Sequence, residues 1–182
     1  MVDLIYRVAM GSRRRRALLT PLGLVVFGTS LLIVVGAGLL MDGVLQMAPL
    51  LPGVVGTALG VILFFVGATL CGWCVLRFRM AAGTPVPFNP PHELVVEGPY
   101  RWSRNPMLTG VFTGLFGLGF LLHSTGMVLM TVPAYILLHV IELKWVEEPE
   151  LERRFGASYV EYKRQVPMFW PWFWRRMKRR AG

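Results

Sequence analysis

The sequence predicts an all-α integral membrane protein with four transmembrane helices, and two observations support this. Of the 182 residues, 54% are hydrophobic and only 16% are charged. In addition, no Asp, Glu, Lys or Arg occurs from Ala17 to Met41, from Gly43 to Leu76 or from Asn105 to Ile141. Each of these stretches exceeds the ~20 residues with which a helix crosses ~30 Å of hydrocarbon. At this length we expect a single membrane domain, residues 1–182.

The first two charge-free stretches each predict one spanning helix, at about 17–40 and 54–76. A basic segment, residues 1–16, precedes this first pair of spans, which we place within 17–76. The connection between the two helices, at 41–53, reads MDGVLQMAPLLPG. Its two prolines and two glycines are typical of a loop.

The third charge-free stretch is too long for one span, because as a single helix it would run roughly 55 Å. The sequence HSTG, at 123–126, interrupts it near the middle. We therefore predict a tight helical hairpin within 108–146, with arms at about 108–122 and 127–143. A polar segment, residues 77–107, precedes the hairpin.

The positions of the basic residues predict the orientation in the membrane. Five Lys or Arg precede the first span, four lie between the second and third spans, and ten follow from Lys144 onward, which accounts for all nineteen. The positive-inside rule then places both termini and the central loop in the cytoplasm, in a multi-pass protein of the cytoplasmic membrane or an endomembrane. Basic clusters beside spans fit anionic lipid headgroups, so we expect membrane lipids and no nucleic acid as partners.

Two motifs inside the spans invite a redox or metal interpretation. The pair Cys71 and Cys74, in CGWC, lies within the second predicted span, where we expect it to serve helix packing. His139 and Glu142 share a helix face at i, i+3. Metal sites in bundles repeat such a motif on a partner helix, and this sequence has no second copy. We therefore predict no metal site and expect both groups to face a polar cavity.

The segment GPYRWSRNPM, residues 98–107, predicts a shaped turn before the third span. Asn105 and Pro106 are suited to the cap and first turn of a helix. The N–H groups of that helix end, together with Arg101 and Arg104, would bind a carboxylate or phosphate. The alternative is a basic and aromatic anchor at the membrane interface, and the residues alone do not separate the two.

A second polar segment follows the fourth span, within residues 147–182, and it reads EEPELERRFG at its start. In a hairpin the start of one arm lies beside the end of the other, so Glu147 and Glu148 should approach the two arginines. We expect Trp102 and Trp145 to cover this site. Such a site suits a zwitterionic or cationic ligand that carries sugar hydroxyls.

These two segments resemble the integral membrane methyltransferases of the isoprenylcysteine carboxyl methyltransferase and phospholipid N-methyltransferase group. The resemblance covers GPYRWSRNPM, the apolar hairpin and EEPELERRFGASYVEYKRQVP, about half of the chain. It implies S-adenosylmethionine as the methyl donor and S-adenosylhomocysteine as the product. The acceptor would be amphiphilic or lipidic, either an isoprenylcysteine-like carboxylate or a phospholipid amine. Asn105 and Leu108 stand where the family often has His and Tyr, so we do not carry over isoprenylcysteine specificity.

The resemblance assigns the donor to both segments at the cytoplasmic end of the last helix pair. We include Met107, at the end of the first motif, and His139, and we expect Arg104, Glu147 and Glu148 to act in the reaction as well. The expected donor contacts are Gly98, Pro99, Tyr100, Arg104, Asn105, Pro106, Met107, His139, Glu147 and Glu148. The alternative function is a small four-helix transporter or scaffold with an interfacial anion site. Transporters, however, commonly show paired repeats, which the two halves of this chain lack.

Overall fold

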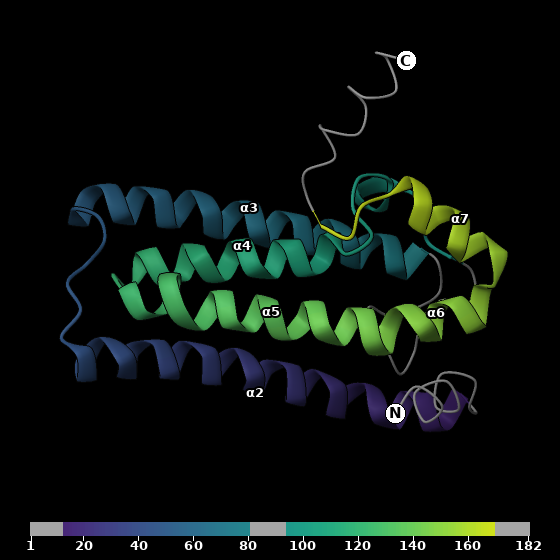
Figure 1. Cartoon of the computed structure of the whole chain (residues 1–182), viewed down its shortest axis with the longest axis horizontal. Helices are drawn as coiled ribbons and strands as arrows, with labels where there is room; N and C mark the ends of the chain where they lie inside the picture. The colour runs from purple at the N-terminus through teal and green to yellow at the C-terminus, as the bar shows by residue number, and fades with distance from the viewer. Residues whose placement is uncertain (1–12, 81–93, 170–182) are drawn as a thin grey trace, which may run out of the picture.

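The computed structural model describes residues 13–80 and 94–169, with side chains from residue 21 onward, and all regular structure in these ranges is helical. Helices α2, α3, α4 and α5 run lengthwise and form the body of the molecule (Figure 1). The short helices α6 and α7 lie at one end of this bundle. The helices are α2 (Arg13–Leu45), α3 (Gly53–Met80), η1 (Gly98–Arg101), α4 (Pro106–Leu121), η2 (Met127–Thr131), α5 (Val132–Glu142), η3 (Leu143–Glu147), α6 (Glu148–Phe155) and α7 (Ala157–Gln165).

Three of the described helical stretches are long and apolar enough to cross a membrane: Pro21–Leu45, Gly53–Met80 and Met127–Phe155. The fourth, Pro106–Leu121, is apolar but has only 16 residues. The all-helical membrane class is therefore confirmed. The count of four spans and their tight hairpin stay predictions.

Two boundaries differ from those expected from the sequence. Helix α2 continues to Leu45, so the loop before α3 begins at Gln46 and not at residue 41. The fourth helical stretch does not end near residue 143 but continues through the π-helical turn η3 into α6. Charge marks where a span can leave hydrocarbon, but it does not end a helix, because Asp, Glu and Lys all extend helices in water.

We name the two ends of the bundle by their residues. The motif end carries residues 94–106 and 148–169, and the turn end carries residues 46–52 and 122–126. At the turn end, the Asp42 carboxylate accepts hydrogen bonds from the Ser124 hydroxyl and from the Gly126 N–H, the latter at 2.7 Å. Asp42 thus satisfies backbone and side-chain donors where the last helical stretch begins, and it ties α2 to that stretch.

Helices α3 and α4 pack backbone against backbone through glycines. A Cβ at Gly60 would lie 2.8 Å from the Gly117 carbonyl oxygen, and a Cβ at Gly67 would lie 2.6 Å from the Gly114 nitrogen. Such close approach is available only where both helices present small residues. Cys71 belongs to the same seam, because its thiol donates to the Met107 carbonyl at 3.5 Å.

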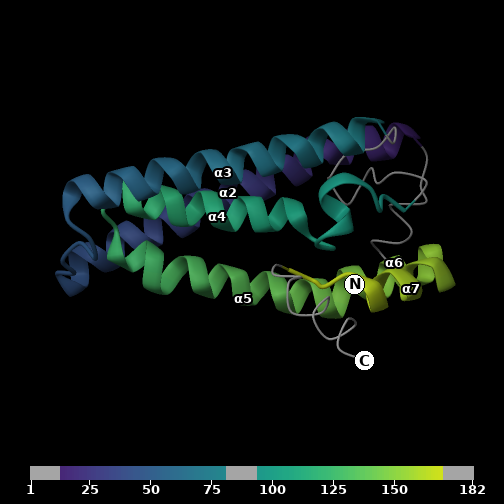
Figure 2. The same ribbon diagram turned by 90° about the horizontal axis from the view of Figure 1, so that it is seen from above.

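The helices separate toward the motif end. Figure 2 shows α5 running close to α4 beside the turn end and moving away from α3 and α4 as it approaches α6. The buried apolar cluster lies on the closed side of this wedge and contains Val34, Phe112, Leu115, Met127, Val132 and Tyr135. The open side of the wedge holds the candidate site.

Candidate functional site

The turn η1 is shaped by Gly98, whose φ is +60°. This backbone conformation favours glycine, and a Cβ here would lie 2.7 Å from the Arg77 Nε atom, so the Arg77 side chain would have to shift. The two residues after it, Pro99 and Tyr100, are buried. The Tyr100 ring packs edge-to-face on Phe78 of α3, with 5.5 Å between ring centroids. The segment is therefore held against α3.

Helix α4 begins at Pro106 with Asn105 at the N-cap position, as the sequence predicts. The Asn105 side chain, however, does not cap the helix: its Nδ2 atom donates to the Met168 carbonyl at 3.3 Å. The prediction of a side-chain cap is wrong, because a later segment of the chain offers this amide a different acceptor.

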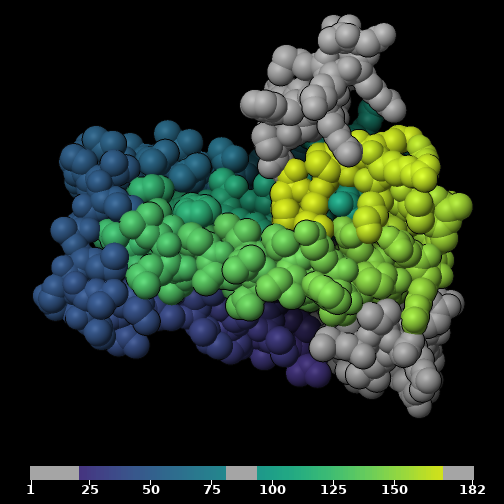
Figure 3. Space-filling view, in the orientation of Figure 1, coloured from purple at the N-terminus to yellow at the C-terminus, as the bar shows by residue number. Residues whose placement is uncertain are grey.

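Residues 166–169 form a strap across the start of α4. The Arg104 N–H donates to Pro167 O at 2.9 Å, the Asn105 N–H donates to Met168 O at 3.2 Å, and the Ser103 hydroxyl donates to Met168 O at 3.0 Å. Figure 3 shows the strap and α7, in yellow, leaving a small patch of the earlier chain, in teal, uncovered. The strap thus fixes the backbone of the first motif.

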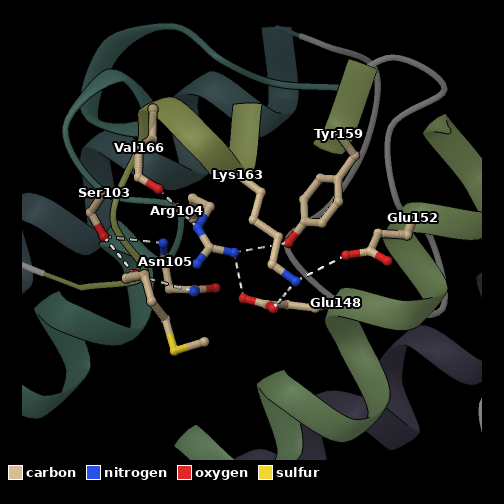
Figure 4. A network of polar contacts seen from close by, with 9 residues as sticks. Ser103, Arg104, Asn105, Glu148, Glu152, Tyr159, Lys163 and Val166 are labelled. Atoms are coloured by element: carbon tan, nitrogen blue, oxygen red, sulfur yellow. Dashed lines mark hydrogen bonds and ion pairs between the residues drawn. The ribbon is translucent and has the colours of Figure 1, made fainter. Parts of the chain in front are cut away.

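Arg104 is the centre of a buried ionic network (Figure 4). Its guanidinium donates to the Glu148 carboxylate, and its Nε donates to Val166 O at 3.0 Å. Both side chains are about nine-tenths buried. Lys163 contacts the second Glu148 oxygen at 2.6 Å and Glu152 at 2.9 Å, and these hydrogen bonds raise the pKa of Lys163. The two motifs therefore meet through a carboxylate shared by two cations.

A cavity of about 210 Å³ lies beside this network, with walls from α2, α3, α4 and the last helical stretch. Its charged and polar residues come from the segment before α4 and from the last helical stretch, and its apolar residues come mainly from α2, α3 and α4. The walls are formed by Gly23, Leu24, Phe27, Phe78, Tyr100, Arg104, Asn105, Met107, Leu108, Val111, His139, Glu142 and Glu147.

The carboxylate of Glu147 is free to meet a ligand in this cavity. Among the described residues, no hydrogen bond or ion pair involves it, whereas Glu148 is held on both oxygens. His139 places its Nδ1 atom 3.1 Å from the Tyr135 carbonyl, which can only accept, so Nδ1 carries the proton and Nε2 is the basic nitrogen. The cavity therefore presents the unpaired Glu147 and the Nε2 atom of His139, which lies 4.0 Å from the Glu142 carboxylate.

A family model for phospholipid methyltransferases matches residues 55–158, more than half of the chain. The chain belongs to the phospholipid methyltransferase family. A curated relative is the nickel-cobalt-cadmium resistance protein NccN of Alcaligenes xylosoxydans xylosoxydans, which is 29% identical over 99 residues. That match covers 54% of this chain and 42% of the relative, so the chain spans less than half of the relative's length. No solved structure matches the chain significantly.

In this member of the phospholipid methyltransferase family, the residues expected to bind the donor divide into two groups. Tyr100, Arg104, Asn105, Met107, His139 and Glu147 line the cavity. Gly98, Pro99, Pro106 and Glu148 do not line it, although Pro99, Pro106 and Glu148 each adjoin a residue that does and Gly98 lies two residues before Tyr100. Their positions indicate that they shape the cavity wall, since Glu148 holds Arg104 and Pro106 begins α4.

Two expectations about the surroundings are wrong. Trp102 and Trp145 do not cover the site: Trp145 is 75% exposed, and Trp102 packs edge-to-face on Trp73 at 5.6 Å. Arg101 is exposed and does not line the cavity, so among the described residues Arg104 is the one Lys or Arg in its wall. Aromatic residues near a polar motif do not reveal which way their rings turn, because that depends on the neighbouring helix.

Sequence reasoning did not identify the contributions of α2, α3 and α7. Leu24, Phe27 and Phe78 line the cavity, and Lys163 holds Glu148. Leu24 and Phe27 lie in an apolar span without a sequence pattern that distinguishes them, so no sequence signal could have identified them. Among the described residues, no group of three or more His, Cys, Asp and Glu is placed to hold a metal ion.

Proposed function

We propose that this family member transfers a methyl group from S-adenosylmethionine to an amphiphilic acceptor at the membrane surface. The observation that carries the proposal is a cavity whose wall joins charged and polar residues of the two motifs to apolar residues of the spanning helices. A water-soluble donor and a lipid-dissolved acceptor have to meet at such a boundary. Both motifs of the resemblance contribute to it through Arg104 and Glu147.

One part of the cavity wall fits the donor. The unpaired carboxylate of Glu147 suits an amino group, a sulfonium or ribose hydroxyls, and Tyr100, Met107 and Phe78 offer apolar surface to a flat base. Arg104 and Asn105 complete this part of the wall. When bound, the donor supplies a methyl group on a positively charged sulfur. The chain has to orient the acceptor toward that methyl group and exclude water.

The charge of the cavity favours an amine acceptor over a carboxylate. Glu142 and Glu147 both line the cavity, whereas the charge of Arg104 is balanced by Glu148. Methylation forms a nitrogen–carbon bond, breaks the sulfur–carbon bond and leaves that electron pair on sulfur. The amine has to lose a proton, and His139 Nε2 and Glu147 are placed to accept it. A carboxylate would meet two like charges.

The acceptor enters from the side of the bundle in this proposal. Leu24 lines the cavity and is 57% exposed, and the Glu142 side chain on the facing helix is also 57% exposed. The cavity is therefore open between α2 and α5, on a surface that faces lipid if these helices span the membrane. An apolar tail held there would add about 0.8 kcal/mol of binding for each buried CH₂.

Two other functions have less support. Membership of a methyltransferase family does not favour the transporter or scaffold alternative. The name of the relative refers to nickel, cobalt and cadmium resistance, but no His, Cys, Asp and Glu cluster in the described part of this chain would bind such an ion.

The substitution Glu147→Gln tests donor binding, because Glu147 lines the cavity without an ion pair of its own. Binding of S-adenosylhomocysteine to purified protein, measured by calorimetry, should weaken about 10-fold, which corresponds to ~1.4 kcal/mol. The matched control is Glu161→Gln, the same change on the exposed surface of α7, which should bind as wild type does. Wild-type affinity in Glu147→Gln would remove this carboxylate from the donor site.

A further inference from the structure

One side of helix α3 faces α4 and the first motif in antiparallel order. Gly67 lies against Gly114 of α4, and Cys71 and Cys74 follow on the same side of α3, about one and two turns later. Because α4 begins at Pro106, these two cysteines lie opposite its first turn and the turn η1 that precedes it. The CGWC motif therefore extends the seam between α3 and α4 up to the candidate site.

Each of the two cysteines contacts a residue of the cavity wall. The Cys71 thiol donates to the Met107 carbonyl at 3.5 Å, and Cys74 is hydrogen-bonded to the Tyr100 hydroxyl. Tyr100 and Met107 line the cavity, whereas neither cysteine does. Cys74 is also fully buried. A substitution of Cys74 can therefore change a ligand's surroundings only through the residues that Cys74 contacts.

Tyr100 is fixed at its backbone and at the tip of its side chain. Its carbonyl accepts a hydrogen bond of 2.7 Å from the Tyr162 hydroxyl of α7, and its own hydroxyl is bonded to Cys74 of α3. Between these two points its ring packs on Phe78. The side chain is only 7% exposed, so its hydroxyl has to find a partner inside the protein. Without Cys74 the hydroxyl would have to turn to another partner, and the ring would move with it.

We propose that Cys74 is a positioning residue for the methyl donor, because it fixes the orientation of the Tyr100 ring in the cavity wall. The inference rests on the proposed function in taking the ligand at this wall as S-adenosylmethionine. The role goes beyond helix packing, because it depends on the polar group of Cys74 and not on its size.

Binding of S-adenosylhomocysteine to purified protein, measured by calorimetry, tests this role without reading methyl transfer. Cys74→Ala should weaken binding about fivefold, because the apparent Kd rises as the fraction of protein with the ring in place falls. Cys74→Ser supplies a hydroxyl as the partner of Tyr100 and should restore most of the affinity. Lost packing would weaken both variants alike, since serine fills little more space than alanine.

The control for these variants is Gly72→Ala, which lies between the two cysteines. A Cβ at Gly72 meets nothing within 4 Å, so this variant should bind as wild type does.

A double-mutant cycle separates the contact from independent effects of the two residues. Tyr100→Phe removes the same hydrogen bond from the other side and should also weaken binding about fivefold. The double variant, Cys74→Ala with Tyr100→Phe, should bind no more weakly than either single variant, because the contact can be lost only once. Two losses that multiply, to about 25-fold, would show that the residues act independently and would overturn the proposal.

Wild-type affinity in Cys74→Ala would also overturn the proposal, and so would equal weakening in Cys74→Ala and Cys74→Ser. If Cys74→Ala does not fold, Tyr100→Phe decides instead, and wild-type affinity in that variant contradicts the role of Cys74. A wild-type protein that binds no S-adenosylhomocysteine would contradict the proposed function together with this inference. Normal binding by wild type and by Cys74→Ala would contradict the inference alone.

Discussion

At the scale of single residues, Glu148 and Glu147 are neighbours with different surroundings. Glu148 lies between Arg104 and Lys163, whereas Glu147 faces the cavity without an ion pair among the described residues. The difference follows from the helix: adjacent residues point about 100° apart, so one can meet a cation on α7 while the other faces α2. We therefore propose that Glu147 contacts the donor and that Glu148 positions Arg104.

Replacement of Glu148 should affect both folding and binding. Glu148→Ala leaves Arg104 buried without its anion, which typically costs ~3–5 kcal/mol. We expect a clear drop in the Tm of purified protein, together with weaker S-adenosylhomocysteine binding, because Arg104 loses its position. Glu147→Gln should weaken S-adenosylhomocysteine binding without lowering the Tm. An unchanged Tm in Glu148→Ala would show that the buried pair is not a stabilising contact.

Alanine substitutions at Gly98 and Gly156 can be compared to test how Gly98 shapes the first motif. Both have a positive φ, but only Gly98 lies against another side chain, that of Arg77. An alanine at either position should cost ~1–2 kcal/mol in the free energy of unfolding from backbone strain. Gly98→Ala should in addition weaken S-adenosylhomocysteine binding, because Tyr100 follows it, and Arg77→Ala should restore part of that loss. Equal binding in the two glycine variants would contradict this.

At the scale of helices, the seam between α3 and α4 positions the first motif. Gly60, Gly67, Gly110 and Gly117 bring the two backbones together, and α4 starts at the cavity. Separation of these helices would move Asn105 and Met107 away from the wall of the cavity. The seam is thus part of the site, although none of its glycines lines the cavity.

Gly117→Leu should destabilise the protein by several kcal/mol, because its side chain would meet the α3 backbone, where the Gly60 oxygen lies 2.8 Å from the Cβ position. Gly72→Leu is the control, since a Cβ there meets nothing within 4 Å. Thermal unfolding in detergent checks the pair. A similar Tm in both variants would mean that the seam contributes little to stability.

The helices were predictable from the sequence because hydrocarbon imposes a simple rule: about 20 residues without charge. The start of α4 at Pro106 was predictable for a local reason, because proline fits the first turn of a helix. The continuation of the last helical stretch past Glu142 was not predictable, since the charges there suggest the end of a span while helical geometry persists through η3.

The site was predictable only in part, for a related reason. Arg104 and Glu147 stand in motifs whose polar chemistry is conspicuous beside apolar spans. Phe27 is an ordinary aromatic residue of a span, and its place in the cavity wall arises from the way α2 packs against the facing stretch. The strap of residues 166–169 was missed because its contacts are made by backbone carbonyls, which carry no sequence signature.

At the scale of the whole molecule, the basic residues predict which end of the bundle faces the cytoplasm. The turn end carries no Lys or Arg, whereas the motif end carries six of them, Arg101, Arg104, Arg153, Arg154, Lys163 and Arg164. Single cysteines at Gln46 and Gln165, in a background without Cys71 and Cys74, should react with an impermeant maleimide from opposite sides. Gln46 should be labelled from outside and Gln165 only after permeabilisation. Labelling of both from one side would contradict the predicted topology.

The central claim is that the cavity brings a methyl donor and a lipid-dissolved amine together. The most direct measurement incubates purified protein with S-adenosylmethionine labelled in its methyl group and a total lipid extract, and then identifies the labelled lipid. We expect label in an amine-bearing lipid with wild type, and at least ~10-fold less with Glu147→Gln. No labelled lipid with a protein that binds S-adenosylhomocysteine, or equal labelling by Glu147→Gln, would contradict the account.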